Sequence, residues 1–164
     1  MREVPRPVGP TMPIDRQAAE SILRPVGGVE EIQVVGALDE TIIRRCGVET
    51  AARSVWLHPS VVRHSEAQHG GHRRDAEFAL QFLPSAVLRP DLFGRDDRDS
   101  RGRRVDLVHL VKRVAGRPLY VALKFVSAIE AESAADEIWV STAYPVSRGF
   151  LTRRRYKHMI AVDL

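Results

Sequence analysis

Two histidines stand five positions apart in a segment that ends on a Gly-Gly pair. His64 and His69 lie in WLHPSVVRHSEAQHGGH, residues 56–72, and we expect a helix that opens at Pro59-Ser60 and ends at Gly70-Gly71. Three further reactive groups follow on two predicted strands: Lys124, Thr142 and Tyr144. An imidazole, an ammonium group and hydroxyl groups beside concentrated positive charge are sufficient to cleave RNA without a metal ion.

The two histidines are expected to differ in role. Positions five apart differ by about 140° around a helix axis, so His64 and His69 do not share a face. His69 lies in the predicted last turn, where the helix dipole favours a cationic imidazole, and a structural role is one interpretation of it. His64, which follows Arg63, is the better candidate for a catalytic base. A zinc site with His72 is not predicted, because the chain has no HExxH pattern and its single cysteine is Cys46.

Lys124 is the single charged residue in an apolar run, LYVALKFV at residues 119–126. Strict alternation along a strand places the odd-numbered residues toward the core and Lys124 on the opposite face, with Tyr120 and Ala122. A lysine in that position is a candidate phosphate ligand. The alternative is an ordinary solvated outer face of a one-sided sheet.

The next strand, IWVSTAY at residues 138–144, carries hydroxyl groups. Alternation predicts that its even-numbered residues, with Thr142 and Tyr144 among them, share one face and that Ser141 lies on the other. Only one of Ser141 and Thr142 can share a sheet face with Lys124, and alternation does not decide which. Thr142 and Tyr144 offer hydroxyl donors, and the Tyr144 ring could stack on a base, although both residue types are also good strand formers.

Positive charge is concentrated near the C-terminus. The net charge is +4 with a pI of about 9.7, and all but three of the 25 basic residues are arginine, which binds phosphate in a bidentate manner. A GC-rich genome gives the same excess of arginine, so placement carries more weight than the ratio. Residues 138–162 contain no acidic residue but five basic ones: Arg148, Arg153, Arg154, Arg155 and Lys157. This predicts an anion-binding edge near Tyr144, with a solvated basic tail as the alternative.

The elements that must position these groups change from helical to extended along the chain. The proline-rich residues 1–14 are expected to be a flexible lead and residues 15–164 a single domain. A helix is predicted at 75–83, with one apolar stripe formed by Ala76, Ala79, Leu80 and Leu83. A separate turn is predicted to begin at Pro84, and residues 95–104 are predicted to be a charged, solvated loop. Strands are predicted at 31–38, 54–58, 105–114, 119–126 and 138–144. The result is an α+β fold with N-terminal helices packed on a small twisted antiparallel sheet.

Four segments, taken in order, resemble the phage and toxin branch of the barnase, EndoU, colicin and RelE-like nuclease superfamily. They are WLHPSVVRHSEAQH, FLPSAVLRPDLF, YVALKF and WVSTAYP. Members of that branch typically show a strand, a helix with spaced histidines, an "iP.il.nPdl" segment, and antiparallel strands bearing a Lys and a Ser or Thr. The likeness covers Ser54 to Tyr144, about half the chain, and implies a nuclease-like core at about 54–162.

The resemblance implies metal-independent cleavage of RNA, often tRNA or another structured RNA, by a toxin or phage-borne effector that needs no cofactor. His64 takes the place of the helix histidine, Lys124 that of the strand cation, and Thr142 that of the later hydroxyl. His69 and Tyr144 complete the catalytic candidates. The candidates for substrate binding are Arg63, Arg89, Ser141, Arg148, Arg153 and Arg155.

In the expected mechanism, neutral His64 takes the proton of a ribose 2′-OH, which attacks the adjacent phosphorus. Lys124 and an arginine, Arg153 or Arg89, stabilise the charge on the phosphoryl oxygens. Thr142 fixes a phosphate oxygen. Because the nucleophile belongs to the substrate, RNA is cut and DNA is spared.

Two other functions fit the same residues. One is a non-catalytic nucleic-acid-binding or virion-associated module with a basic surface. The other is an interaction domain, such as a component of a toxin-immunity pair, whose arginine-rich surface meets an acidic immunity or antitoxin protein. The N-terminus lacks the apolar stretch of a signal peptide and no apolar run reaches the length of a membrane span, so the expected location is the cytoplasm, of the producing cell or of a target cell, with no membrane partner.

Overall fold

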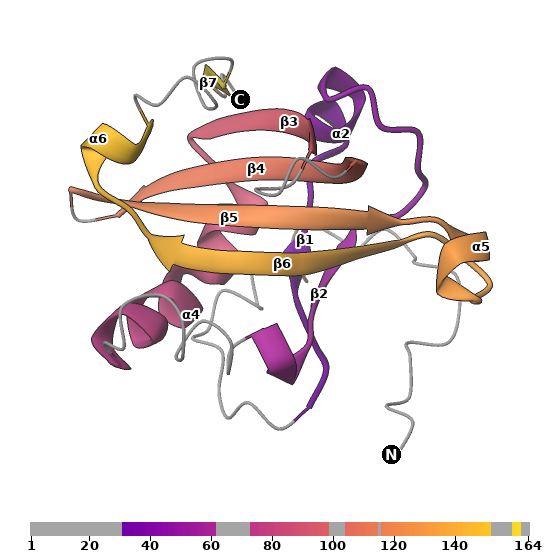
Figure 1. The fold of residues 1–164 in the computed structure, drawn as a ribbon, viewed down its shortest axis with the longest axis horizontal. Coiled ribbons are helices and arrows are strands. Elements are labelled where there is room, and N and C mark those ends of the chain that lie inside the picture. Colours follow the sequence, from indigo (N-terminus) through magenta and orange to yellow (C-terminus); the bar gives the residue numbers. More distant parts are fainter. Residues whose placement is uncertain (1–30, 62–72, 99–103, 115, 152–158, 162–164) are drawn as a thin grey trace.

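The computed structural model describes residues 31–61, 73–98, 104–114, 116–151 and 159–161. Within these ranges seven strands form one sheet in the order β1-β2-β6-β5-β4-β3-β7 (Figure 1). The strands are β1 Gln33–Ala37, β2 Ser54–Leu57, β3 Leu92–Arg98, β4 Arg104–Val114, β5 Arg117–Val126, β6 Glu137–Pro145 and β7 Ile160–Ala161. The helices are α2 Glu40–Arg45, α4 Arg73–Leu88, α5 Ala128–Ala131 and α6 Arg148–Leu151. The predicted combination of helices with a mostly antiparallel sheet is confirmed.

The neighbours β2 and β6 run parallel, and every other neighbouring pair in the described sheet is antiparallel. A parallel pair needs a long crossover, and here the crossover contains α4 and the strands β3 to β5. Of the neighbouring strands, Ser54–Leu57 and Glu137–Pro145 are the pair most widely separated in sequence, and they lie second and third in the sheet.

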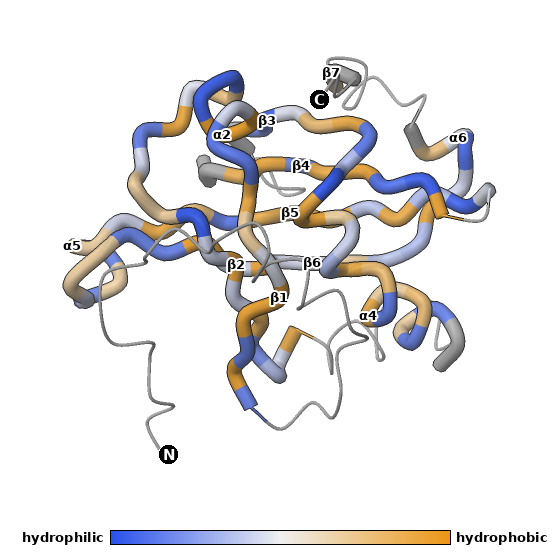
Figure 2. The backbone as a smooth tube through the Cα atoms, turned by 180° about the vertical axis from the view of Figure 1, so that it is seen from behind, coloured by the Kyte–Doolittle hydropathy of each residue, from blue (hydrophilic) through white to orange (hydrophobic). Residues whose placement is uncertain are grey.

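Helix α4 covers one face of the sheet, and the main core lies between them (Figure 1). The predicted apolar stripe of the helix faces inward, with Ala79 and Leu83 buried against Val121 and Leu123 of β5 and their neighbours. Seen from behind, apolar stretches of the chain run along the central strands and along α4 (Figure 2). The helical period of the sequence was thus sufficient to predict which side of α4 is buried.

Pro84 does not end α4, contrary to the prediction of a separate turn. The helix continues from Arg73 to Leu88 with Pro84 inside it. A proline within a helix removes one backbone hydrogen bond. Leu83, Ala86 and Val87 are fully buried on either side of the proline, and this packing holds the last turn in place.

The predicted loop at residues 95–104 is also wrong, because much of it is strand. β3 extends to Arg98 and pairs with β4 from Arg104 onward, with a register shift between Asp96 and Arg98. The charged side chains find partners within the fold. Arg95 Nη1 donates to the carbonyl oxygens of Cys46 and Gly47, each at 3.1 Å. A run of charge therefore did not mean a solvated loop.

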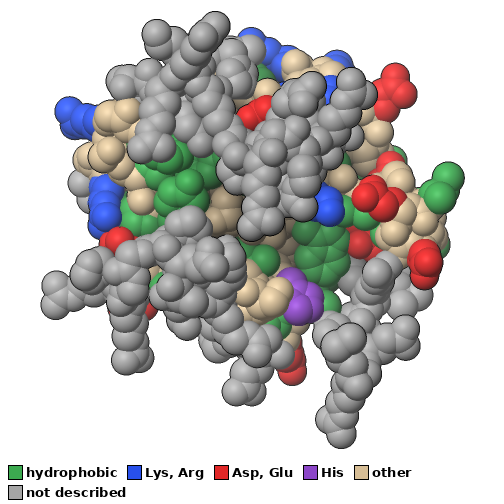
Figure 3. Space-filling model, in the orientation of Figure 1, with side chains coloured by type: hydrophobic (Ala, Val, Ile, Leu, Met, Phe, Trp, Pro, Cys, Tyr) green, Lys and Arg blue, Asp and Glu red, His purple; other side chains and the backbone are tan. Residues whose placement is uncertain are grey.

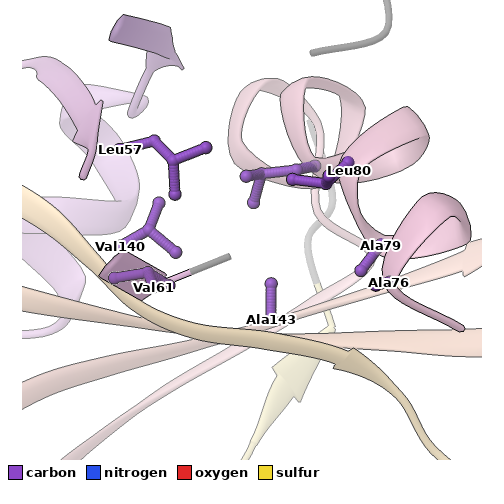
Figure 4. Close-up of a pocket in the computed structure, with 8 residues that line it drawn as sticks. Leu57, Val61, Ala76, Ala79, Leu80, Val140 and Ala143 are labelled. Carbon is purple, nitrogen blue, oxygen red and sulfur yellow. The ribbon is translucent and has the colours of Figure 1, made fainter. Parts of the chain in front are cut away.

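A small apolar void of about 10 Å³ remains between α4 and the sheet (Figure 4). It is lined by Leu57 and Val140 from the strands and by Ala76, Ala79 and Leu80 from the helix, among others. A space of this size holds about one water molecule at most, and an apolar lining offers no hydrogen bonds to retain it. The void belongs to the packed core and not to a binding site.

The Leu83→Ala substitution should lower the free energy of unfolding by about 2–5 kcal/mol, because Leu83 is fully buried beside this void. Gln81→Ala, on the exposed side of the same helix, should change it by less than about 0.5 kcal/mol. Urea unfolding measures both values. Equal effects of the two substitutions would contradict the packing of α4 described here.

Candidate functional site

The face of the sheet opposite α4 carries the reactive side chains. On β5, Leu119, Val121 and Leu123 join the core beneath α4, as predicted from alternation. Tyr120 and Ala122 belong to a second, smaller cluster on the other side, and Lys124 is exposed there. We call this second side the open face.

A bulge in β6 decides which hydroxyl group reaches the open face. Ala122 pairs with Thr142, whereas the next residue of β5, Leu123, pairs with Val140, so β6 contains one extra residue at this point. Because a bulge shifts the alternation by one, Thr142 and Tyr144 lie on the face opposite Val140. The prediction that the even-numbered residues of this strand share one face is therefore wrong. Thr142 shares the face of Lys124, and Ser141 is exposed at the bulge.

The strand register arranges the open face in rows that cross the sheet. One row contains Lys124, Trp139 and Trp56, the next His109, Ala122 and Thr142, and the third Val111, Tyr120 and Tyr144. Arg113 and Pro118 pair one step further along. Lysine thus stands at one end of the face and arginine at the other, with aromatic and hydroxyl side chains between them.

The Lys124 end of the face is an aromatic platform with a cation at its edge. Lys124 is exposed, and no ion pair joins it to another residue of the described part. Its neighbour Trp139 packs against Trp56, with ring centroids 6.3 Å apart, and against His58 at 6.4 Å. Figure 3 looks onto this side of the molecule and shows a histidine beside apolar side chains. Flat rings beside a free cation can bind an unpaired base and its phosphate together.

His58 is held in one orientation by the start of the next segment. Its Nδ1 lies 2.7 Å from the Ser60 hydroxyl and accepts the Ser60 backbone N–H at 3.1 Å. An Nδ1 that accepts from the backbone N–H carries no proton, so the proton of the neutral ring is assigned to Nε2. Residues 59–61 are helical, which agrees with the predicted helix start at Pro59-Ser60.

Glu137 fixes the orientation of the indole. Its Oε2 accepts a hydrogen bond from Trp139 Nε1 at 2.7 Å. The side chain is only 6% exposed, and Oε1 makes no hydrogen bond. A buried carboxylate oxygen without a hydrogen-bond partner lowers stability. Glu137 therefore holds the indole of the platform at some expense of folding free energy.

The centre of the face is a buried polar and aromatic cluster. His109 is 1% exposed; its Nδ1 hydrogen-bonds the Tyr120 hydroxyl and its Nε2 lies 3.6 Å from Asp96 Oδ2. The Tyr120 ring packs in turn against Tyr144 at 5.3 Å and Phe150 at 5.6 Å. These residues position Tyr144 at the margin of the cluster. His109 is too deeply buried to act on a substrate directly.

Next to this cluster, Thr142 offers a hydroxyl group with no partner. Its Oγ1 is buried and makes no hydrogen bond, although the residue as a whole is partly exposed. The paired residue across the strand is Ala122, which is buried. A hydroxyl in this position can donate to an oxygen of a bound group.

The structure brings three of the predicted catalytic residues onto one face: Lys124, Thr142 and Tyr144. Arg148 is exposed on α6, at the opposite end from Lys124. Arg89 lies beside Lys112, whose Nζ donates to the Arg89 carbonyl at 2.8 Å, and Lys112 alternates with the open-face residues of β4. The remaining candidates fall outside the described residues: Arg63, His64, His69, Arg153 and Arg155.

Sequence reasoning missed His58, Trp56, Glu137, His109 and Arg113. For His109 a signal existed, since a histidine inside the apolar strand RVDLVHLVKRV needs a polar partner. Trp56 and Glu137 gave no such signal, because their positions depend on the parallel pairing of β2 with β6.

Other kinds of site are not supported by the described residues. No group of three or more His, Cys, Asp or Glu in the described ranges is arranged to hold a metal ion. Burial raises the pKa of the Cys46 thiol, and the nearby Arg95 and Arg45 only partly oppose this effect. A thiol with a raised pKa is a poor nucleophile at neutral pH. No described helix is long and apolar enough to cross a membrane.

Comparisons with known proteins add no assignment: no family model matches the sequence, and no curated protein or solved structure matches it significantly. Function is therefore inferred from the side chains of the open face.

Tyr120→Phe should lower the free energy of unfolding by about 1–3 kcal/mol, because it leaves buried His109 without the hydroxyl partner. His109→Leu should cost less when Tyr120 is already Phe than in the wild-type chain, with a coupling of about 0.5–3 kcal/mol. Urea unfolding of the two single variants and the double variant measures this coupling. Strictly additive effects would show that the two side chains do not interact.

Proposed function

We propose that this chain is a metal-independent endoribonuclease that binds RNA on its open face and cleaves it beside Lys124. The observation that supports this most is the position of Lys124: exposed, in register with Trp139, and on the same face as the unpaired hydroxyl of Thr142. An ammonium group, a hydroxyl and a stacking platform on one side of a sheet suit a phosphate and an unpaired base.

Each group has a definite task in the proposed reaction. An imidazole takes the proton of the ribose 2′-OH, and the oxygen attacks the adjacent phosphorus. The bond from phosphorus to the 5′-oxygen of the next nucleotide breaks, and that oxygen leaves as a hydroxyl with a proton from the imidazolium. The products are a 2′,3′-cyclic phosphate and a 5′-OH. Lys124 and Thr142 stabilise the negative charge that develops on the phosphoryl oxygens.

Two histidines are candidates for the imidazole. His64 is the residue implied by the family resemblance, and it follows the helical start at residues 59–61 by a few positions. His58 lies at the described site, against Trp139, with Nδ1 engaged by Ser60. With Nδ1 held in this way, the neutral ring carries its proton on Nε2, so Nε2 cannot accept a proton from the substrate. We therefore favour His64 as the base and His58 as a structural support of the platform.

The fold is compatible with the nuclease arrangement that the sequence resembles. A helix packs on one face of a mostly antiparallel sheet, and the lysine and hydroxyl strands, β5 and β6, are neighbours. We propose that the chain has the arrangement of the barnase, EndoU, colicin and RelE-like superfamily, with the site on the open face. We also propose an acidic immunity or antitoxin protein as a partner of the arginine-rich surface, and a location in the cytoplasm of the producing cell or of a target cell.

Lys124→Ala should lower the rate of RNA cleavage by about 10²–10³-fold, because it removes a charge that stabilises the transition state. Lys112→Ala is the matched control: it removes the same charge from β4, on a side chain that binds the Arg89 carbonyl instead of facing the open side. Initial rates on total RNA, measured in EDTA, give the comparison. Equal losses of cleavage rate in the two variants would show that Lys124 contributes only to the overall positive charge of the protein.

His64→Ala should lower the same rate by about 10²–10⁴-fold, as expected for loss of a general base, whereas His58→Ala should have the smaller effect. The cyclic phosphate end, identified by mass spectrometry, and the absence of cleavage in 2′-deoxy substrates report on the mechanism. Salt-dependent RNA binding without cleavage by the wild-type chain would instead identify a non-catalytic RNA-binding module.

A further inference from the structure

A pocket of about 460 Å³ lies at the end of the open face that is remote from Lys124. Its described lining is two arginines, Arg113 and Arg148, over Leu92, Gly116 and Pro118. Leu92 also packs against the cluster that contains Tyr120, so the pocket continues the open face. Figure 3 shows basic side chains at the α6 end of this view and acidic ones near α5.

The two arginines come from different elements and converge on the pocket. Arg113 follows His109 and Val111 in the alternation of β4 and pairs with Pro118 of β5. Arg148 is the first residue of α6, after the end of β6. Both residues are exposed, and neither forms an ion pair with another residue of the described part.

The neighbouring charges do not neutralise the pocket. No acidic residue is among the described residues that line it. Asp91 accepts the backbone N–H of Arg113 at 2.7 Å, but its other oxygen lies 3.8 Å from Lys112 Nζ, so this carboxylate already has a cation. Arg117 is different again, since it binds Asp75 at 3.0 Å and lies over the Phe78 ring of α4.

We propose that this pocket is a second phosphate subsite, which binds the backbone of the same single-stranded RNA several nucleotides away from Lys124. Pro118 and Lys124 are six positions apart on β5, a distance of about 20 Å along the strand. The proposal rests on the proposed function, and it adds a substrate class: an unpaired RNA segment long enough to reach both ends of the face. Two arginines together with apolar residues in one pocket lining suit a phosphate that carries a nucleoside.

The side chains between the two ends fit this occupant. Tyr144 is partly exposed in the row next to the pocket, and Thr142, also partly exposed, lies in the next row toward Lys124. Aromatic rings accept bases of any identity, and a hydroxyl can bind a backbone oxygen. A mononucleotide or dinucleotide would occupy one end only.

Binding of RNA of increasing length tests the subsite in the full chain. The probes are fluorescein-labelled oligoribonucleotides of two, four, six and eight residues with 2′-O-methyl groups, which prevent cleavage, and the readout is fluorescence anisotropy. The wild-type chain should bind the longer probes more tightly. The double substitution Arg113→Ala with Arg148→Ala should weaken binding of the longest probe about 10-fold or more and leave the dinucleotide within about twofold.

The salt dependence gives a second readout. The slope of log affinity against log salt should fall by about 0.7 for each phosphate contact that the double variant loses. Arg117→Ala removes a charge from the same hairpin on the side of α4, and it should change neither the length dependence nor the slope. Unchanged thermal melting of the double variant establishes that it is folded.

The outcomes separate this inference from the proposed function. Equal weakening at every length, or none, overturns the subsite, and so does competition by inorganic phosphate without any length dependence. Length-dependent binding that is lost in the double variant supports the subsite even if the wild-type chain cleaves no RNA, a result that would overturn the catalytic proposal alone.

Discussion

Burial of one face of the sheet against α4 is the constraint on which the rest of the molecule depends. Once Leu119, Val121 and Leu123 are committed to that core, the pleat of β5 leaves Tyr120, Ala122 and Lys124 no other side to occupy. The register with β4 and β6 then brings His109 and Thr142 into line with Ala122. The composition of the open face is therefore a consequence of how the opposite face is packed, and a slip of one residue in register would exchange the two sets.

The bulge in β6 modifies this constraint at one point. Without the extra residue, Thr142 and Tyr144 would continue the core side with Val140, and two polar groups would have to be buried beneath α4. With it, Ala143 takes the core position and the hydroxyl residues join the open face. A bulge that re-aims side chains beside a candidate site is a feature that sheets commonly use.

Several parts of the fold could be predicted from the periodicity of the sequence, and other parts could not. The stripe on α4 and the alternation in β5 are local patterns, and both were predictable from Ala79, Leu83 and Lys124. The bulge was not predictable, because the segment WVSTAY has the pattern of a regular strand and the shift depends on the pairing with β5. The charged residues 95–98 were misassigned because Arg95 contacts Cys46 and Gly47 and Asp96 contacts His109, all of which lie outside the predicted loop.

The same limit applies to the candidate site. Lys124 was recognisable as a charge in an apolar run, whereas the platform of Trp56, Trp139 and Glu137 needs two distant segments to be placed side by side. Arg113 could be recognised as a pocket residue only from the structure, which places Arg148 and Pro118 in the same pocket lining. A reactive side chain within one β-strand can be recognised from the sequence, whereas a site that several β-strands form together can be recognised only when the topology of the sheet is known.

The parallel pairing of β2 with β6 affects the order in which the chain can fold during its synthesis. Trp56 is synthesised well before Trp139, and the two rings can meet only after β6 has emerged from the ribosome. Pairings this distant in sequence form slowly and late. A polypeptide that is terminated before Trp139 would lack the assembled aromatic platform, so whatever this platform does can begin only after β6 has been synthesised.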